Sequence, residues 1–230
     1  MERVVILLME SSLETIPKEL LSNPIIIKDA RRMHEDPKYL ILDRARHHRV
    51  MINLPKSEKR GRPDIVHQAL LLIQGSLLAR NKLIKTYIHT INDVIIDVNP
   101  EIRPPRNYNN FIGLMSQLFR EGKVPPGASK SLLRIIGHDI RQVFNIEAPD
   151  RKILLDDIKG KEVSMNYLIN YLSRFRKPLI MIGGFPRGSF EENTYLLADD
   201  ILKVGKYTMD TSSILCRLLA SLEIALGLFA

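Results

Sequence analysis

The chain has 230 residues, of which 45% are hydrophobic and 26% are charged, a composition typical of an ordinary folded globular protein. No apolar run approaches the ~20 residues that a membrane-spanning helix needs, and the single cysteine excludes an internal disulfide and a cysteine-rich zinc site. The formal net charge of +8 favours an acidic partner, and because the first residues lack a signal-peptide cleavage pattern, a cytoplasmic location is expected.

The first part of the chain predicts strands separated by helices. Residues 4–8 form a compact apolar run typical of a buried strand. Residues 12–23 have apolar side chains at helical spacing, and Asn23-Pro24 is expected to end that helix. Residues 39–42 predict a second strand. Asp64 is a candidate cap for the next helix. Its predicted inner face consists of Ile65, Ala69, Leu70, Ile73, Leu77 and Leu78.

The rest of the chain continues this alternation. Residues 84–100 alternate around a turn at Asn92-Asp93 and predict a β-hairpin, and a helix is expected from about Pro105 to Gly122. Residues 130–140 are apolar but of uncertain type. A helix at 163–175, strands at 177–185 and 201–207, and a final helix from about Asp210 follow. The fold class is therefore α/β, with no convincing linker, so we expect one domain over residues 1–230 that carries insertions.

A basic cluster lies between the predicted second strand and the next helix. Residues 44–62 carry seven basic side chains opposed by Glu58 alone. They are Arg44, Arg46, Arg49, Lys56, Lys59, Arg60 and Arg62. The excess favours nucleic acid as the partner, with a merely solvated face as the alternative. His47-His48 is expected on a strand with its two rings on opposite faces, and no metal-binding spacing accompanies it, so no metal site is predicted.

Two further clusters suit contacts to nucleic acid. In "KRGRPD", Asp64 lies close enough to hold the guanidinium of Arg62 in one orientation, although a surface ion pair explains the same spacing. In "EIRPPRNYNNF", Arg103, Arg106 and Asn110 have the spacing of one helix face. Arginine and asparagine suit phosphate and base-edge contacts. An exposed first helical turn is the alternative reading.

The stretch "IMIGGFPRGSF" contains an apolar strand that runs into Gly183 and Gly184, with Gly188 following. In α/β sheets, ligands bind beyond the carboxyl ends of the strands, where small residues let the backbone approach them. A tight strand-to-helix turn without a ligand fits the spacing equally well. The sequence has no phosphate-loop, dinucleotide-binding or nucleophile-elbow glycine motif.

Taken together, "LDRARHHRVMINLP", "KRGRPDIVHQALL", "RPPRNYNNFIGLMSQLF" and "IGGFPRGSF" resemble the archaeal and eukaryotic pseudouridine-N1-specific rRNA methyltransferases, the nucleolar essential protein family. The likeness covers nearly the whole chain. It implies a SPOUT-type fold, with a parallel sheet flanked by helices, a β-hairpin-containing extension and a C-terminal trefoil knot in residues 178–230. It also implies a homodimer that binds S-adenosylmethionine in the knot region.

The resemblance also assigns site residues by matching position. Two cofactor loops are implied, and they contain Gly183, Gly188, Val204, Gly205, Lys206, Tyr207, Thr208 and Met209. Two basic RNA-binding insertions are implied at 44–64 and 101–112, with contacts from Arg62, Asp64, Arg103, Arg106 and Asn110. The chain departs from the family at Arg187, where histidine is frequent, and at Thr208-Met209, where Pro-Leu or similar is frequent.

The implied reaction is methylation of N1 of a pseudouridine in a small-subunit rRNA hairpin loop, as part of small-subunit ribosome biogenesis. Asp64 is the candidate catalytic carboxylate, although orienting Arg62 is its more expected task. Ribosomal proteins or assembly factors are further candidate partners, whereas membrane and metal are not expected. The alternative is a non-catalytic rRNA-binding assembly factor or RNA chaperone that uses the same basic surface.

Overall fold

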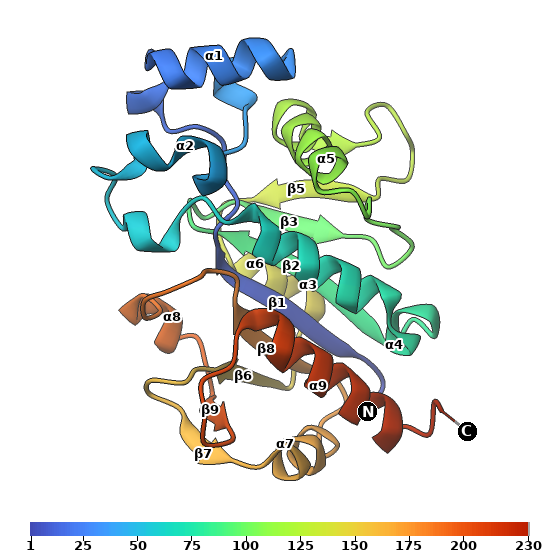
Figure 1. The fold of residues 1–230 in the computed structure, drawn as a ribbon. Coiled ribbons are helices and arrows are strands. Elements are labelled where there is room, and N and C mark those ends of the chain that lie inside the picture. Colours follow the sequence, from blue (N-terminus) through green and yellow to red (C-terminus); the bar gives the residue numbers. More distant parts are fainter. Residues whose placement is uncertain (230) are drawn as a thin grey trace.

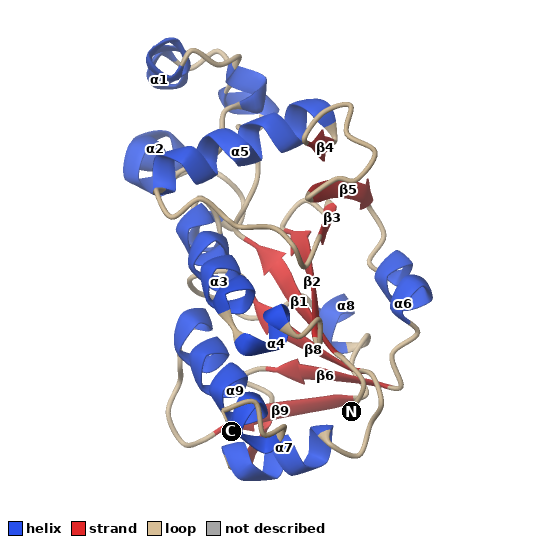
Figure 2. Ribbon diagram, turned by 90° about the vertical axis from the view of Figure 1, so that its right-hand side faces the viewer, coloured by secondary structure: helices blue, strands red, loops and turns tan. Residues whose placement is uncertain are grey.

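The computed structural model describes residues 1–229, which build one mixed sheet with helices on both faces (Figures 1 and 2). The strands are β1 (Val4–Ser11), β2 (Ile84–Thr90), β3 (Ile95–Val98), β4 (Lys123–Val124), β5 (Leu133–Gly137), β6 (Arg151–Leu155), β7 (Lys161–Val163), β8 (Pro178–Gly183) and β9 (Asp200–Val204). Within the described residues their order is β4-β5-β3-β2-β1-β8-β6-β9-β7. The neighbouring strands β2, β1, β8, β6, β9 and β7 are parallel to one another. The strands β3, β5 and β4 extend the sheet by antiparallel pairing.

The helices are α1 (Pro24–Met33), α2 (Arg44–Met51), α3 (Pro63–Gly75), α4 (Leu77–Arg80), α5 (Tyr108–Glu121), α6 (Arg141–Glu147), α7 (Met165–Leu172), α8 (Glu192–Tyr195) and α9 (Thr211–Ala225). Short 3₁₀ turns occupy Lys18–Leu20, Pro37–Tyr39 and Ser57–Lys59. Figure 2 shows α3, α7 and α9 on one face of the sheet, with α6 and α8 on the other. The helices α1 and α2 extend beyond one end of the sheet, near α5 (Figure 1).

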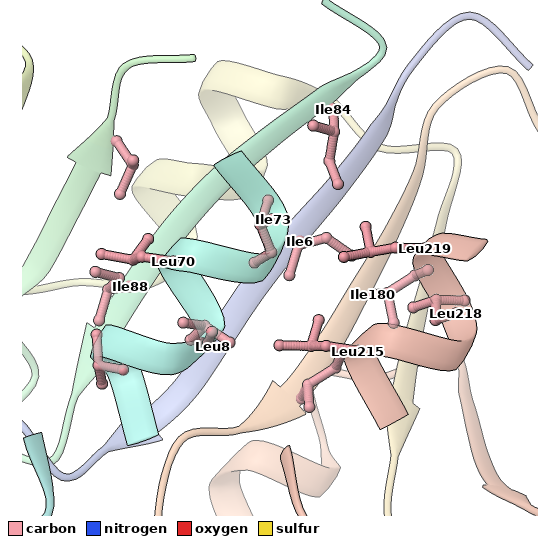
Figure 3. Close-up of a cluster of buried hydrophobic side chains, with 14 of the residues drawn as sticks. Ile6, Leu8, Leu70, Ile73, Ile84, Ile88, Ile180, Leu215, Leu218 and Leu219 are labelled. Atoms are coloured by element: carbon pink, nitrogen blue, oxygen red, sulfur yellow. The ribbon is translucent and has the colours of Figure 1, made fainter. Parts of the chain in front are cut away.

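The central strand β1 is buried along its whole length. On one face, Ile6 and Leu8 pack among side chains of α3 and α9, including Leu70 and Leu215 (Figure 3). On the other face, Leu7 and its alternate neighbours pack toward α6 and α8. A strand covered on both faces needs apolar residues at every position, which explains the unbroken apolar run in the sequence.

Several predicted elements are confirmed. The hairpin forms from β2 and β3, and because β2 also pairs with β1, the hairpin extends the main sheet. The predicted helix at 163–175 contains α7, and the predicted final helix is α9, capped by the Asp210 side chain. The strands β8 and β9 lie in the predicted positions. The α/β class is therefore confirmed, whereas the knot stays a prediction.

The N-terminal predictions were partly wrong. The expected helix at 12–23 is reduced to the 3₁₀ turn Lys18–Leu20, and Asn23-Pro24 begins a helix instead of ending one. The Asn23 side chain accepts a hydrogen bond from the Ile25 amide, and proline fits the first helical position because it needs no amide donor there. The predicted strand at 39–42 contributes only one isolated bridge, between Ile41 and Thr15.

Two helix starts were also misplaced. Arg62, rather than Asp64, occupies the N-cap position of α3, and Asp64 lies in its first turn. The helix α5 begins at Tyr108 with Asn107 as its cap, so Arg103 and Arg106 precede it. The predicted helix face that joins Arg103, Arg106 and Asn110 is therefore wrong. The unclassified segment at 130–140 contains β5.

Within residues 1–229, no helix combines the length and the hydropathy needed to cross a bilayer.

Candidate functional site

A cavity of about 600 Å³ opens at the carboxyl ends of three adjacent parallel strands, β8, β6 and β9. Three loops meet there, and each one directly follows one of these strands. The position is the one expected for a ligand in an α/β sheet. The volume lies within the range of ~300–1,000 Å³ that is usual for small-molecule sites. Of the two readings left open for "IMIGGFPRGSF", the ligand cavity is therefore the one that the geometry supports.

The loop after β8 supplies one wall. Gly183 and Gly188 both line the cavity, as do Phe185 and Phe190. The φ angle of Gly188 is +100°, a conformation that side chains other than glycine rarely adopt. The Gly183 carbonyl accepts a hydrogen bond of 2.7 Å from the Thr211 hydroxyl, so this loop is tied to the start of α9.

The loop after β9 supplies a second wall. Val204, Tyr207, Thr208 and Met209 line the cavity. Gly205 and Lys206 belong to the same loop but are absent from the lining formed by the described residues. Six of the eight predicted cofactor residues are therefore brought together around one cavity.

The third wall, the loop after β6, was missed in the sequence. Leu155, Asp156 and Asp157 line the cavity, and the Asp157 carboxylate accepts a 2.7 Å hydrogen bond from the Thr208 hydroxyl. Asp156 is buried, and its Oδ2 accepts hydrogen bonds from the Lys159 amide at 2.7 Å and from the Tyr195 hydroxyl at 3.2 Å. Burial, together with this carboxylate, raises the pKa of Tyr195 to about 12. The apolar run Ile153-Leu154-Leu155 ending at two aspartates was the signal that could have revealed this loop.

The helix α3 closes the cavity from outside the three loops. Arg62, Ile65 and Gln68 lie at intervals of three along it and line the cavity. Arg62 makes a two-bond fork with Asp64, from Nε to Oδ1 at 2.8 Å and from Nη2 to Oδ2 at 2.7 Å. These hydrogen bonds raise the pKa of the Arg62 guanidinium further. The predicted Arg62–Asp64 pairing is therefore confirmed.

The other predicted RNA residues lie beside α3 on the loop before α5. Arg103 reaches the Gln74 carbonyl at 3.5 Å near the end of α3, and the Pro105 carbonyl meets His67 in the middle of the helix. Arg106 and Asn110 are exposed. The loop thus follows α3 back toward Arg62. Among the described predicted RNA residues, Arg62 is the one that also lines the cavity.

The basic cluster is less free than its composition suggests. Five of its seven basic side chains pair with carboxylates that lie outside residues 44–62, and four of these carboxylates are distant in the chain. The pairs are Arg46–Asp29, Lys56–Glu191, Lys59–Glu10, Arg60–Glu14 and Arg62–Asp64. Arg44 instead donates to the Ser57 carbonyl. The local excess of positive charge is therefore largely compensated within the fold.

The two adjacent histidines lie on α2 rather than on a strand. His47 is fully buried: its Nδ1 accepts from the Asp43 amide at 3.0 Å, and its Nε2 faces the Asp29 carboxylate at 3.2 Å. His48 is exposed. Within residues 1–229, no three His, Cys, Asp or Glu side chains are grouped to hold a metal ion.

The chain is similar to known methyltransferases over nearly its whole length. The EMG1/NEP1 methyltransferase family model matches residues 6–223. The "Ribosomal RNA small subunit methyltransferase Nep1" of Pyrobaculum calidifontis is 39% identical over 98% of this chain and 100% of its own length. The protein of the same name from Sulfurisphaera tokodaii is 38% identical over 98% of this chain and 99% of its own.

A solved structure gives the same result. The crystal structure of Archaeoglobus fulgidus Nep1 bound to S-adenosylhomocysteine superposes with a TM-score of 0.84 and 34% identity, covering 99% of this chain and 100% of that one. The fold is thus that of an α/β methyltransferase. The chain belongs to the EMG1/NEP1 methyltransferase family, which confirms the resemblance seen in the sequence.

Proposed function

We propose that the protein transfers a methyl group from S-adenosylmethionine to N1 of a pseudouridine in small-subunit ribosomal RNA. The observation that carries this proposal is the position of Arg62. This side chain lines the loop cavity and starts the helix beside which the loop of Arg103 and Arg106 runs. A cofactor in the cavity and an RNA along α3 would therefore meet at Arg62.

The cavity residues fit the proposed cofactor. The backbone of Gly183 and Gly188 lines the cavity, and the φ angle of +100° at Gly188 favours glycine, so this wall suits a ligand held through main-chain groups. We infer that residues 183–188 and 204–209 hold S-adenosylmethionine, with the loop after β6 as a third contact. This cofactor would supply an electrophilic methyl group. S-adenosylhomocysteine, which Archaeoglobus fulgidus Nep1 binds, is what remains after such a transfer.

The proposed target base follows from bond connectivity. In uridine, N1 is joined to the ribose and has no proton to exchange for a methyl group. In pseudouridine the ribose is attached through C5, which leaves N1 as a free N–H at the ring edge. The base must also leave its stack to reach the cavity, which a hairpin loop makes less costly.

On this proposal, the chain contributes mainly alignment. Arg62, fixed by Asp64, would orient the target nucleotide from its phosphate side, and Arg103 and Arg106 would hold the backbone of the loop. The N1 proton must leave during transfer. Asp64 is the candidate carboxylate for accepting this proton. Both of its oxygens already accept hydrogen bonds from Arg62, however, which favours the task of orienting Arg62.

Two measurements test the proposal. Calorimetry with S-adenosylhomocysteine should detect binding to the purified protein, and Gly188→Val should abolish it by forcing a side chain into a +100° φ angle. Labelled methyl transfer should then occur to an rRNA hairpin with pseudouridine at the target and not to the same hairpin with uridine. Equal labelling of both hairpins, or label on uridine alone, contradicts the proposal.

The same experiment separates the enzyme from the alternative of a non-catalytic assembly factor. A factor of that kind would bind the hairpin without binding the cofactor product. The homodimer, further ribosomal partners and a cytoplasmic location stay predictions from the resemblance and the sequence.

A further inference from the structure

Lys59 belongs to the basic cluster at residues 44–62, but its side chain is buried. Its side chain is only 4% exposed. The ammonium donates to the Glu10 carboxylate at 2.7 Å and lies 3.4 Å from the Glu191 carboxylate. It also lies 4.6 Å from the ring centroid of Phe185, and its Cε would be 3.2 Å from a Cβ placed on Gly188. Lys59 thus contacts the back of the loop whose front lines the cavity.

Glu10 holds the far end of the same loop. This residue is 4% exposed and lies near the end of β1. Its φ angle is +48°, a value that residues other than glycine rarely adopt. Its Oε1 accepts from the Glu191 amide at 2.9 Å and from the Thr194 hydroxyl at 2.7 Å, while its Oε2 faces Lys59. The two side chains therefore hold residues 185–191 between β1 and the basic segment.

We propose that Lys59, held by Glu10, is a positioning residue for the cofactor: it fixes Phe185 and Gly188 at the cavity wall. Among the described residues, neither Lys59 nor Glu10 lines the cavity, so both act through the loop. This inference rests on the proposed function, since it requires a cofactor in that cavity. It also gives a role to a lysine that the basic composition alone would assign to RNA.

Stability alone does not account for this arrangement. A buried ion pair must repay the desolvation of both charges, and replacing such a pair with neutral groups of similar volume is frequently neutral or stabilising. The arrangement does, however, define the orientation of the side chain. The Lys59 ammonium is paired with Glu10 and lies over the Phe185 ring, and the two contacts together fix its position. A neutral replacement would therefore keep the fold while loosening the loop.

The test uses the neutral pair Lys59→Met with Glu10→Gln. Lys59→Met alone would leave the Glu10 charge buried and unpaired, and could unfold the protein. In the double variant, methionine retains most of the side-chain volume, and glutamine can still accept from Glu191 and Thr194. Lys56→Met is the matched control, because Lys56 pairs with the same Glu191 at 2.7 Å but is 53% exposed, whereas it is Lys59 that lies over the Phe185 ring and against Gly188.

We expect the double variant to melt near the wild-type temperature and to bind S-adenosylhomocysteine about tenfold more weakly by calorimetry. Its KM for S-adenosylmethionine should rise, while kcat at saturating cofactor and affinity for the RNA hairpin without cofactor stay unchanged. Lys56→Met should match the wild type in its affinity for S-adenosylhomocysteine. Wild-type cofactor affinity in the double variant overturns the inference, as does a parallel loss of RNA affinity and melting temperature. Failure of the wild type itself to bind the cofactor product would instead overturn the proposed function.

Discussion

His67 and Pro105 join the two elements that carry the candidate RNA contacts. The Nε2 atom of His67 on α3 lies 2.6 Å from the Pro105 carbonyl oxygen, so this nitrogen must carry the proton and donate. The imidazole also stacks on Phe111 of α5 at 4.5 Å between ring centroids. The loop of Arg103 and Arg106 is therefore attached to the helix that Arg62 begins.

His67→Phe tests this attachment. Phenylalanine keeps a ring against Phe111 but removes the donor, and one hydrogen bond contributes about 1 kcal/mol. We expect RNA-hairpin affinity to fall several-fold in a fluorescence titration because the arginine loop is no longer fixed. Cofactor affinity should not change, since His67 lies outside the described cavity lining. Unaltered RNA affinity in the folded variant would contradict the interpretation.

Arg103 and Arg106 should contribute charge to RNA binding. Changing both to alanine is expected to weaken hairpin binding and to reduce the salt dependence by about two phosphate contacts. The measurement is hairpin affinity across a salt series. Arg174→Ala, an exposed arginine after α7, is the control and should leave the slope as it is. A wild-type slope in the double variant would mean that this loop is only solvated.

Asp64→Asn should separate activity from stability. The Arg62 and Asp64 side chains are 42% and 33% exposed, and an exposed pair of this kind contributes no more than about 1 kcal/mol to folding. The melting temperature should therefore change little. Methyl transfer to the pseudouridine hairpin should fall by roughly ten- to a hundredfold, because Arg62 loses its fixed orientation. If kcat/KM for the hairpin stays at the wild-type value, Asp64 does not orient Arg62 for catalysis.

His47 should make stability depend on pH. Burial lowers its pKa below the usual ~6.5, and its Nδ1 already accepts from the Asp43 amide, so a second proton has no place there. Below pH ~6.5 the unfolded chain binds a proton that the folded chain does not, so stability is full above that pH and declines as pH falls.

Urea unfolding at pH 7 and pH 5 measures this decline. His47→Gln cannot titrate, and it should be less stable than the wild type at pH 7 but lose less stability on going to pH 5. Equal losses in both proteins would show that other groups cause the acid sensitivity.

The basic segment illustrates where sequence reasoning stops. Its composition predicted a polyanion surface, but the partners Glu10, Glu14 and Glu191 lie far away in the chain. Only tertiary structure brings them within bonding distance. The sequence analysis predicts its two histidines on a strand, whereas the Asp43 side chain caps a helix there by accepting from the Ala45 amide. Local pattern alone did not decide between the two.

The part of the candidate site that follows β8 could be predicted from the sequence. Gly183 and Gly188 follow a strand of unambiguous apolar character, and the rule for ligands at the carboxyl ends of strands then places the cavity. The aspartates after β6 were missed because that strand was not recognised. The spacing of Arg103 and Arg106 suggested a helix, but two successive prolines precede Arg106 and disfavour helical geometry before them.

The pairing of β1 has a consequence for biosynthesis. The first strand of the chain lies between β2 and β8, with Val5 opposite both Lys85 and Leu179. A nascent chain therefore carries a largely apolar strand of eight residues with one unpaired edge until β8 has left the ribosome. Contacts of such large sequence separation slow folding, and an open apolar edge invites aggregation. Fragments that stop before β8 should accumulate as insoluble material, and the nascent protein should depend on chaperones until its last quarter is synthesised.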